Sequence, residues 1–236
     1  MPPDPSAAAF LAARPAPLEL VIFDCDGILV DSEGIANRIV ARELTALGWE
    51  MTPAEADHLF LGMTLPDMRP MIEAHTGRPL PTGFDTYLRA CFEHGLAQEA
   101  EAIPGAITAL DGVTSLGLPW RIASNSSHEE MAVKFARIGI TERAAGRIHS
   151  YLDVPRGKPA PDIYLAAAAA EGVAPANCIV IEDSQTGVRA AIAAGMTCLG
   201  YAPHDSGPAL AALGAIPFNS MYDLPALLAH APRRRA

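Results

Sequence analysis

A short hydrophobic run that ends in acidic residues constrains this chain more than any other feature. Residues 18–23 read LELVIF and are followed by Asp24, Cys25, Asp26 and Gly27. An apolar run with β-branched members is typical of a strand buried on both faces. Parallel α/β sheets bind their ligands at the carboxyl ends of their strands. The two acids therefore predict a functional site at the end of a buried parallel strand.

The bulk composition argues against two classes of partner. The chain has 236 residues, of which 50% are hydrophobic, so it is long enough to bury a sizeable core. Its formal net charge of −10 argues against nucleic-acid binding, which usually needs a basic patch. No apolar stretch approaches the roughly 18 residues that span a bilayer, so we expect no membrane partner.

The cysteines and the first residues indicate a cytoplasmic protein. Cys25, Cys91, Cys178 and Cys198 are widely separated and form neither a C-x-x-C pair nor a short disulfide framework. Free cysteines of this kind behave as small hydrophobic residues in a reducing compartment. Residues 1–17 lack a basic n-region and are broken by prolines, so we interpret them as a flexible leader and not as a signal peptide.

The order of the predicted elements indicates an α/β fold with a helical insertion. Residues 33–103 show helical spacing of apolar residues without a convincing strand. The later part alternates between strands and helices, as right-handed β-α-β units do. Its predicted strands cover residues 120–124, 147–151, 178–181 and 197–201, and its predicted helices cover 106–116, 128–138, 162–171 and 187–194. We predict a doubly wound parallel sheet formed by residues 18–32 and 104–236, into which residues 33–103 are inserted.

Polar residues gather where the predicted strands end. They are Asp24 and Asp26, Ser124 and Asn125, Lys158 in GKPAPD, and Glu182 with Asp183. The strand ends of a doubly wound sheet converge on one crevice, so we expect these side chains to face one another. Clustered carboxylates repel unless a cation lies between them, and hard oxygen ligands favour Mg²⁺. Ser124, Asn125 and Lys158 offer donors to phosphoryl oxygens, whose charge must be neutralised during phosphoryl transfer.

The spacing of Asp24 and Asp26 suits two roles in one reaction. In strand geometry both side chains point the same way, about 6 to 7 Å apart at about 3.3 Å per residue. One carboxylate can then attack phosphorus while the other reaches the leaving oxygen. We predict that Asp24 is a nucleophile that forms an aspartyl phosphate. Asp26 is then the general acid and, later, the base that activates water.

Four stretches of the sequence together resemble the motifs of the haloacid dehalogenase superfamily. They are DCDGILVDS, Ser124 in RIASNSS, GKPAPDIY, and IEDSQTGVRAA, and they occur in the family's order. The insertion resembles the helical C1 cap of subfamily IA, which contains sugar phosphatases, phosphoglycolate phosphatase and β-phosphoglucomutase. The resemblance implies a Rossmann-like core, hydrolysis of a small sugar, sugar-acid or polyol phosphate monoester, and Mg²⁺ as the cofactor.

The resemblance also implies roles for individual residues. By this resemblance Asp24, the backbone carbonyl of Asp26, and Asp183 bind Mg²⁺, and Glu182 binds it directly or through water. The catalytic candidates are Asp24, Asp26, Lys158 and Ser124. The candidates for contact with the phosphate or the rest of the substrate are Ser124, Asn125, Lys158, Cys25, Gly62 and Met63.

Two other functions stay open at this point. A mutase of the β-phosphoglucomutase kind would isomerise its substrate without releasing phosphate. The positions where the resemblance places the mutase's His and Arg carry Ala36 and Leu65, which weakens this alternative. A phospho-accepting signalling module would also combine acids, Mg²⁺ and a lysine, but it would need neither Asp26 nor the insertion. For the enzyme we expect a small phosphate ester as partner and either a monomer or a weak homodimer.

Overall fold

The computed structural model describes residues 5–60, 63 and 65–233 of the chain. The fold divides into two compact units. The core unit is Met1–Val30 with Ala102–Ala236, and the insertion unit is Asp31–Glu101. The insertion therefore begins and ends close to the residues predicted from the sequence, 33 and 103.

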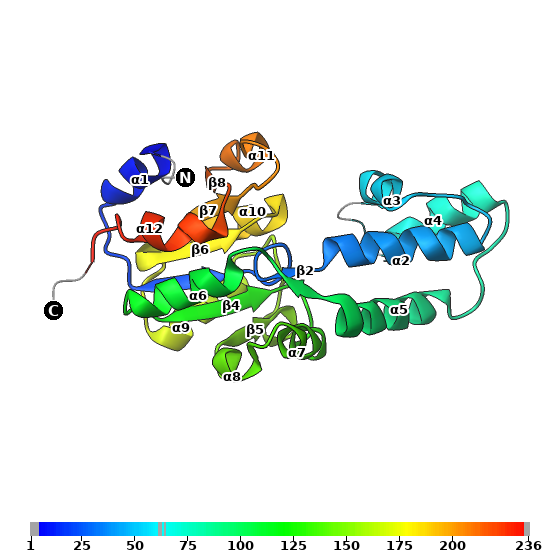
Figure 1. Ribbon diagram of the computed structural model, residues 1–236, viewed down its shortest axis with the longest axis horizontal. Helices are drawn as coiled ribbons and strands as arrows, with labels where there is room; N and C mark the ends of the chain where they lie inside the picture. Colours follow the sequence, from blue (N-terminus) through cyan, green and yellow to red (C-terminus); the bar gives the residue numbers. More distant parts are fainter. Residues whose placement is uncertain (1–4, 61–62, 64, 234–236) are drawn as a thin grey trace. The chain divides into compact units, whose positions relative to one another are not determined.

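A six-stranded parallel sheet forms the centre of the core unit (Figure 1). Its strands are β1 (Leu20–Phe23), β4 (Trp120–Ser124), β5 (Ile148–Ser150), β6 (Cys178–Glu182), β7 (Thr197–Tyr201) and β8 (Ile216–Phe218). They lie in the order β5-β4-β1-β6-β7-β8, and each neighbouring pair is parallel. The strand that precedes the insertion thus lies between strands that follow it. The predicted fold class is confirmed.

The register of β1 determines which residues meet at the carboxyl edge of the sheet. Strand β1 is buried along its whole length, as its unbroken apolar sequence LVIF predicts. Phe23 pairs with Ile122 of β4 on one side and with Ile181 of β6 on the other. The backbone N–H of Asp24 continues this ladder and donates to the carbonyl of Ile181 at 3.0 Å. The residues that end β1, β4 and β6 are therefore neighbours.

Helices cover both faces of the sheet. Helices α9 (Asp162–Glu171) and α10 (Gln185–Ala193) share one apolar core with Leu20 and Ile22, which are alternate residues of β1. Helices α6 (Ala106–Ser115) and α12 (Leu224–Leu228) lie on the opposite face. The core unit also contains α1 (Pro5–Ala12), α7 (His128–Arg137), α8 (Thr141–Ala144) and α11 (Pro208–Ala211), with the 3-10 helices η1 (Tyr151–Asp153), η2 (Pro175–Asn177) and η3 (Met221–Asp223).

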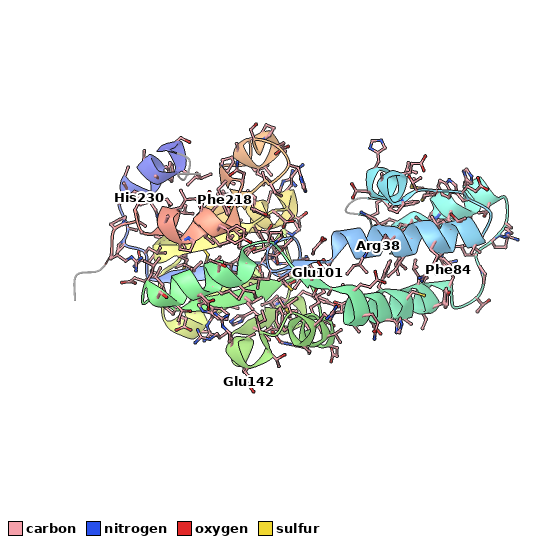
Figure 2. The ribbon with its side chains drawn as sticks, viewed as in Figure 1. Arg38, Phe84, Glu101, Glu142, Phe218 and His230 are labelled. Carbon is pink, nitrogen blue, oxygen red and sulfur yellow. The ribbon has the colours of Figure 1, made fainter. Side chains whose placement is uncertain are left out.

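The insertion unit is helical, as predicted. It contains α2 (Glu33–Ala46), α3 (Pro53–Phe60), α4 (Leu65–Thr76) and α5 (Phe84–Glu99). Arg38 of α2 forms an ion pair of 2.8 Å with Glu99 of α5, and Arg38 is labelled in Figure 2. The short strands β2 (Val30–Asp31) and β3 (Glu101–Ala102) form a separate two-stranded sheet. Across the described part of the chain, no helix combines the length and the apolar character needed to cross a membrane.

The prediction of a flexible leader is wrong for residues 5–14. Residues Pro5–Ala12 form α1, in which Ala7 and Leu11 are fully buried. These two residues are four apart, so they lie on one face of the helix. Arg14 then donates from Nη2 to the carbonyl oxygens of Ala176 at 2.8 Å and Cys178 at 3.4 Å. The prolines around this segment favoured the prediction of a flexible leader, although the spacing of Ala7 and Leu11 is helical.

Candidate active site

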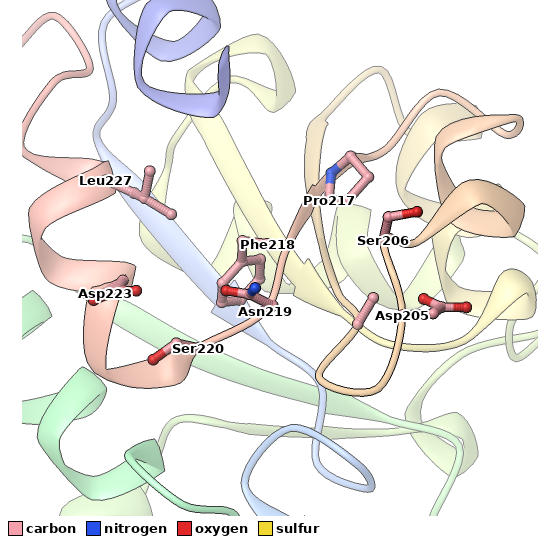
Figure 3. A pocket seen from close by; sticks show the side chains of 9 residues that line it. Asp205, Ser206, Pro217, Phe218, Asn219, Ser220, Asp223 and Leu227 are labelled. Carbon is pink, nitrogen blue, oxygen red and sulfur yellow. The ribbon is translucent and has the colours of Figure 1, made fainter. Parts of the chain in front are cut away.

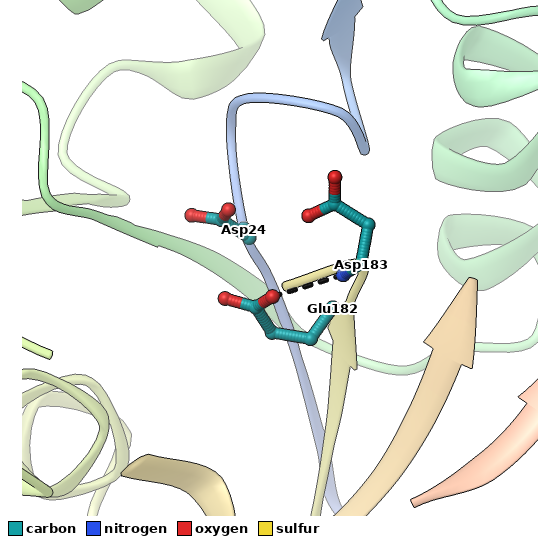
Figure 4. A group of neighbouring side chains, drawn as sticks. All are labelled: Asp24, Glu182 and Asp183. Atoms are coloured by element: carbon teal, nitrogen blue, oxygen red, sulfur yellow. Dashed lines mark hydrogen bonds between the residues drawn. The ribbon is translucent and has the colours of Figure 1, made fainter. Parts of the chain in front are cut away.

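Three acidic residues from two neighbouring strands meet at the carboxyl edge of the sheet. Asp24 directly follows β1, Glu182 is the last residue of β6, and Asp183 follows it. Each residue offers a carboxylate oxygen, and these atoms all lie within 4.8 Å of one another (Figure 4). Because all donors are hard oxygens, this acidic cluster could hold a divalent cation such as Mg²⁺. The cluster contains three of the four acids predicted for the metal site, and Asp26 is the one outside it.

Lys158 connects two members of this cluster. Its Nζ donates to Oδ1 of Asp24 at 2.7 Å and to Oε1 of Glu182 at 2.8 Å. Burial opposes the charge of the ammonium, but the two carboxylates outweigh it, so the pKa of Lys158 lies above its ordinary value. Lys158 is therefore a fixed positive charge beside the predicted nucleophile.

The environment of Asp24 favours the uncharged form of its carboxyl group. Burial raises the pKa of Asp24 to about 7, against the lowering effect of Lys158, and the neighbouring charges of Glu182 and Asp26 raise it further. The negative charges around Asp24 are thus incompletely balanced by the protein alone. A divalent cation in the acidic cluster would supply the missing positive charge.

Glu182 is fully buried, and protein donors saturate its carboxylate. Oε1 accepts from Lys158 and from the hydroxyl of Tyr164 at 3.0 Å. Oε2 accepts from the backbone N–H of Asp183 at 2.9 Å, shown dashed in Figure 4, and from the N–H and hydroxyl of Ser184 at 2.8 and 2.9 Å. An ionised carboxylate offers about four lone-pair sites, and these five donors occupy them. Glu182 is therefore better suited to fixing Lys158 and the end of β6 than to binding a metal directly.

Three glycines allow the carboxylates and the Lys158 loop to approach the backbone. A Cβ at Gly27 would overlap the carboxylate of Asp183, and Gly27 also has a φ of 71°, which favours glycine. A Cβ at Gly187 would overlap the carboxylate of Glu182. A Cβ at Gly157 would lie 2.7 Å from Oδ1 of Asn125. Larger side chains at these positions would displace groups of the candidate site.

Ser124 is the last residue of β4, which neighbours β1, and Asn125 follows it. The Oγ of Ser124 accepts from the backbone N–H of Ser126 at 3.1 Å, which leaves its own hydroxyl hydrogen to donate to a phosphoryl oxygen. Asn125 contacts the backbone of Lys158, and its predicted contact with a phosphate stays a prediction. Its Oδ1 accepts from the N–H of Lys158 at 2.9 Å, and its Nδ2 donates to the carbonyl of Lys158 at 3.1 Å. The Asn125 side chain therefore fixes the backbone of Lys158.

Asp26 forms an ion pair with a second lysine, Lys134. Lys134 of α7 donates to both carboxylate oxygens of Asp26, at 2.7 and 2.9 Å, and the hydroxyl of Ser126 donates to Oδ2 at 2.8 Å. Neither Lys134 nor Ser126 is predicted from the sequence to be a functional residue. The available signal is the position of Lys134 in the predicted helix, on the same face as Met131 and Phe135, where an apolar residue is expected.

Comparison with known proteins identifies the family. The model of the haloacid dehalogenase-like hydrolases matches residues 18–195. The chain belongs to this family. Among its relatives, 6-phosphogluconate phosphatase from Escherichia coli (strain K12) is 32% identical over 180 residues, which cover 76% of this chain and 80% of that protein. Hexitol phosphatase A from the same strain is 33% identical over 179 residues, which cover 74% and 78%.

A solved structure supports the same assignment. The HAD family hydrolase from Deinococcus radiodurans R1, solved with bound phosphate and sodium, has 35% sequence identity and a TM-score of 0.81. The superposition covers 91% of this chain and 96% of that one. The predicted family and the predicted hydrolase activity are confirmed.

Three further residues of this haloacid dehalogenase-like hydrolase are predicted to contact the substrate, namely Cys25, Met63 and Gly62. The thiol of Cys25 is fully buried, so Cys25 can meet a ligand only through its backbone. Met63 lies in the insertion unit, where its N–H donates to the carbonyl of Phe60 at 2.9 Å. Gly62 lies outside the described residues. Direct contact of these three residues with a substrate stays a prediction.

A small cavity of this hydrolase lies apart from the candidate site residues. Its volume is about 160 Å³, and Figure 3 shows it near the carboxyl ends of β7 and β8. Asp205, Ser206, Phe218 and Asn219 are among the residues that line it. None of the predicted catalytic or metal-binding residues lines this cavity. This cavity is therefore separate from the candidate site.

Proposed function

We propose that this haloacid dehalogenase-like hydrolase is a Mg²⁺-dependent phosphatase. Its substrate is a small sugar, sugar-acid or polyol phosphate monoester, and its intermediate is a phosphorylated Asp24. The observation that carries the proposal is the contact of Lys158 with Asp24 beside the acidic cluster, because it combines a buried nucleophile with a fixed positive charge. Relatives that act on phosphogluconate and on hexitol phosphates support the substrate class.

The residues at the acidic cluster fit a magnesium ion. Asp24 and Asp183 would hold it through their carboxylates, and Asp26 through its backbone carbonyl. Glu182 would act through the groups that it fixes, since its own oxygens already accept five hydrogen bonds. When bound, Mg²⁺ supplies the positive charge that the phosphoryl oxygens and the clustered carboxylates require.

The side chains of the chain can carry out both halves of the hydrolysis. In the first half, a carboxylate oxygen of Asp24 bonds to phosphorus as the bond to the ester oxygen breaks, and Asp26 gives its proton to that leaving oxygen. In the second half, Asp26 takes a proton from water as the water oxygen bonds to phosphorus. The bond from Asp24 to phosphorus then breaks, which releases phosphate and restores both acids. Lys158 and Ser124 neutralise the phosphoryl oxygens throughout.

The test is phosphate release from a panel of sugar, sugar-acid, polyol and two-carbon phosphates, with Mg²⁺ and with a chelator. We expect release from at least one substrate that is lost with the chelator and in Asp24→Asn, while Asp111→Asn, which changes an exposed acid, keeps it. Product NMR distinguishes the alternatives. An isomerised phosphate without release would indicate a mutase, and a lasting acyl phosphate on Asp24 without turnover would indicate a signalling module.

A further inference from the structure

Helix α7 presents a lysine to the interior of the core unit. The helix begins with a capping box, in which Ser127 Oγ accepts from the N–H of Glu130 at 3.1 Å and the N–H of Ser127 donates to Glu130 Oε2 at 2.8 Å. This cap fixes where the helix begins. Lys134 then lies with Met131 and Phe135 on the buried face.

The ammonium of Lys134 uses its three donors on Asp26 and Ser126. It donates to Asp26 Oδ1 at 2.7 Å, to Asp26 Oδ2 at 2.9 Å and to Ser126 Oγ at 2.8 Å. Ser126 in turn donates to Asp26 Oδ2 at 2.8 Å. The Lys134 side chain is 4% exposed, whereas that of Asp26 is 33% exposed. Lys134 therefore holds the carboxylate from the interior while part of Asp26 remains accessible.

Ser126, in the loop that follows β4, is itself held by the last residues of β4 and β5. Its carbonyl accepts from the hydroxyl of Ser150 at 2.7 Å, and its N–H donates to Ser124 Oγ at 3.1 Å. Hydrogen bonds thus run from Asp26 through Ser126 to Ser124, the predicted phosphate-binding hydroxyl. These hydrogen bonds link the position of Asp26 to that of Ser124, which is expected to contact the phosphoryl group.

Stability alone does not account for a buried lysine at this position. Replacing a buried ion pair with apolar residues of similar volume is often neutral or stabilising, because desolvation of the charges offsets their attraction. Three short contacts to one carboxylate and its serine neighbour instead restrict the orientation of that carboxylate. Proton transfer depends on such restriction, since the donor must lie within hydrogen-bond reach of the reacting oxygen.

We propose that Lys134 is a positioning residue for Asp26, and that it acts together with Ser126. This inference rests on the proposed function, because that function gives Asp26 the proton-transfer role. Lys134 keeps its three protons throughout the reaction. Asp26 gives one proton to the leaving oxygen when the ester bond breaks and regains one from the attacking water.

The test compares two substrates that differ in their need for a proton donor. One is the best alkyl phosphate of the panel, whose leaving oxygen requires a proton, and the other is p-nitrophenyl phosphate, whose leaving group does not. Because general acid catalysis contributes about 10²- to 10⁴-fold, we expect Lys134→Met to lower kcat on the alkyl phosphate by about 10²-fold. The KM should change little, and the loss on p-nitrophenyl phosphate should be less than about 10-fold.

Two further variants complete the design. Ser126→Ala keeps Lys134 and should lower kcat on the alkyl phosphate by about 10-fold, again with a smaller effect on p-nitrophenyl phosphate. Arg137→Met removes an exposed cation from the same helix and should leave both activities within about twofold. If Lys134→Met fails to fold, Ser126→Ala decides the question.

The outcomes separate this inference from the proposed function. Equal losses on both substrates, or full activity in a folded Lys134→Met, would overturn the positioning role while leaving a working phosphatase. A wild-type protein that releases no phosphate from any member of the panel would overturn the proposed function and the inference with it. Substrate-dependent losses in both variants would support the inference.

Discussion

The ammonium nitrogen of Lys158 lies 2.7 Å from Oδ1 of Asp24, although 134 residues separate the two in the sequence. The same nitrogen lies 2.8 Å from Oε1 of Glu182. One cation thus compensates two buried carboxylates from adjacent strands. Removing it would leave both carboxylates in an interior that disfavours uncompensated charge.

We expect Lys158→Met to destabilise the metal-free protein by about 3–5 kcal/mol near neutral pH or above, as the loss of one partner of a buried ion pair does. The loss should be smaller near pH 5, because Asp24 can then take up a proton. Urea denaturation at both pH values measures the effect. Arg156→Met is the control, since Arg156 is 71% exposed in its pair with Asp162 and should contribute less than about 1 kcal/mol. Equal destabilisation by the two variants would contradict the interpretation.

The raised pKa of Asp24 predicts how pH affects stability and metal binding. The folded protein keeps the Asp24 proton up to about pH 7, whereas an unfolded Asp loses it near its ordinary pKa of about 3.9. Between these values the folded state binds more protons, so Asp24 lowers the free energy of unfolding as pH rises from about 4 to about 7. Mg²⁺ must displace this proton, so its apparent affinity should fall as pH falls below about 7.

Thermal unfolding with and without Mg²⁺ measures this coupling. We expect the stabilisation by Mg²⁺ to be larger near pH 8 than near pH 5.5, because only the ionised carboxylate binds the ion well. Asp24→Asn should show little stabilisation at either pH. Stabilisation that is independent of pH in the wild type would contradict a shared role of Asp24 in proton and metal binding.

The meeting of Asp24, Glu182 and Asp183 could be predicted from the sequence because it depends only on strand order. Each acid ends an unbroken apolar run, and in a parallel sheet such ends lie along one edge. The hydrogen bonds of Asn125 could not be predicted in this way. Its contact with the Lys158 backbone depends on the path of the loop after β5, which the spacing of GKPAPD does not determine. The burial of Lys134 could not be predicted either, because it depends on the rotational orientation of α7. Successive residues of a helix are rotated by about 100°, so a small error in this orientation exchanges buried and exposed positions.

Substituting Gly27 tests the metal site, and a second glycine with a similar φ provides a control for backbone strain. Gly27→Ala would place a Cβ against the carboxylate of Asp183, at a φ of 71°. Gly117→Ala has nearly the same φ, 70°, but meets no atom within 4 Å, so it carries only the backbone cost of about 1 kcal/mol.

We therefore expect Gly27→Ala to weaken Mg²⁺ binding by about tenfold or more, since Asp183 must move, whereas Gly117→Ala should leave it unchanged. Calorimetric titration with Mg²⁺ measures both affinities. Equal Mg²⁺ affinities in the two variants would show that Asp183 does not contribute to the metal site in the way that the cluster suggests.

Helix α1 gives a prediction about stability away from the active site. Leu11 is fully buried, whereas its neighbour Phe10 is 54% exposed. If the helix is an integral part of the core unit, Leu11→Ala should destabilise the protein by about 2–5 kcal/mol, the usual cost of truncating a buried leucine. Phe10→Ala should change the free energy of unfolding by less than about 0.5 kcal/mol, although it removes a larger side chain. Urea denaturation of the two variants provides the comparison. Equally small changes in the free energy of unfolding would support the flexible leader that the prolines of this segment predict.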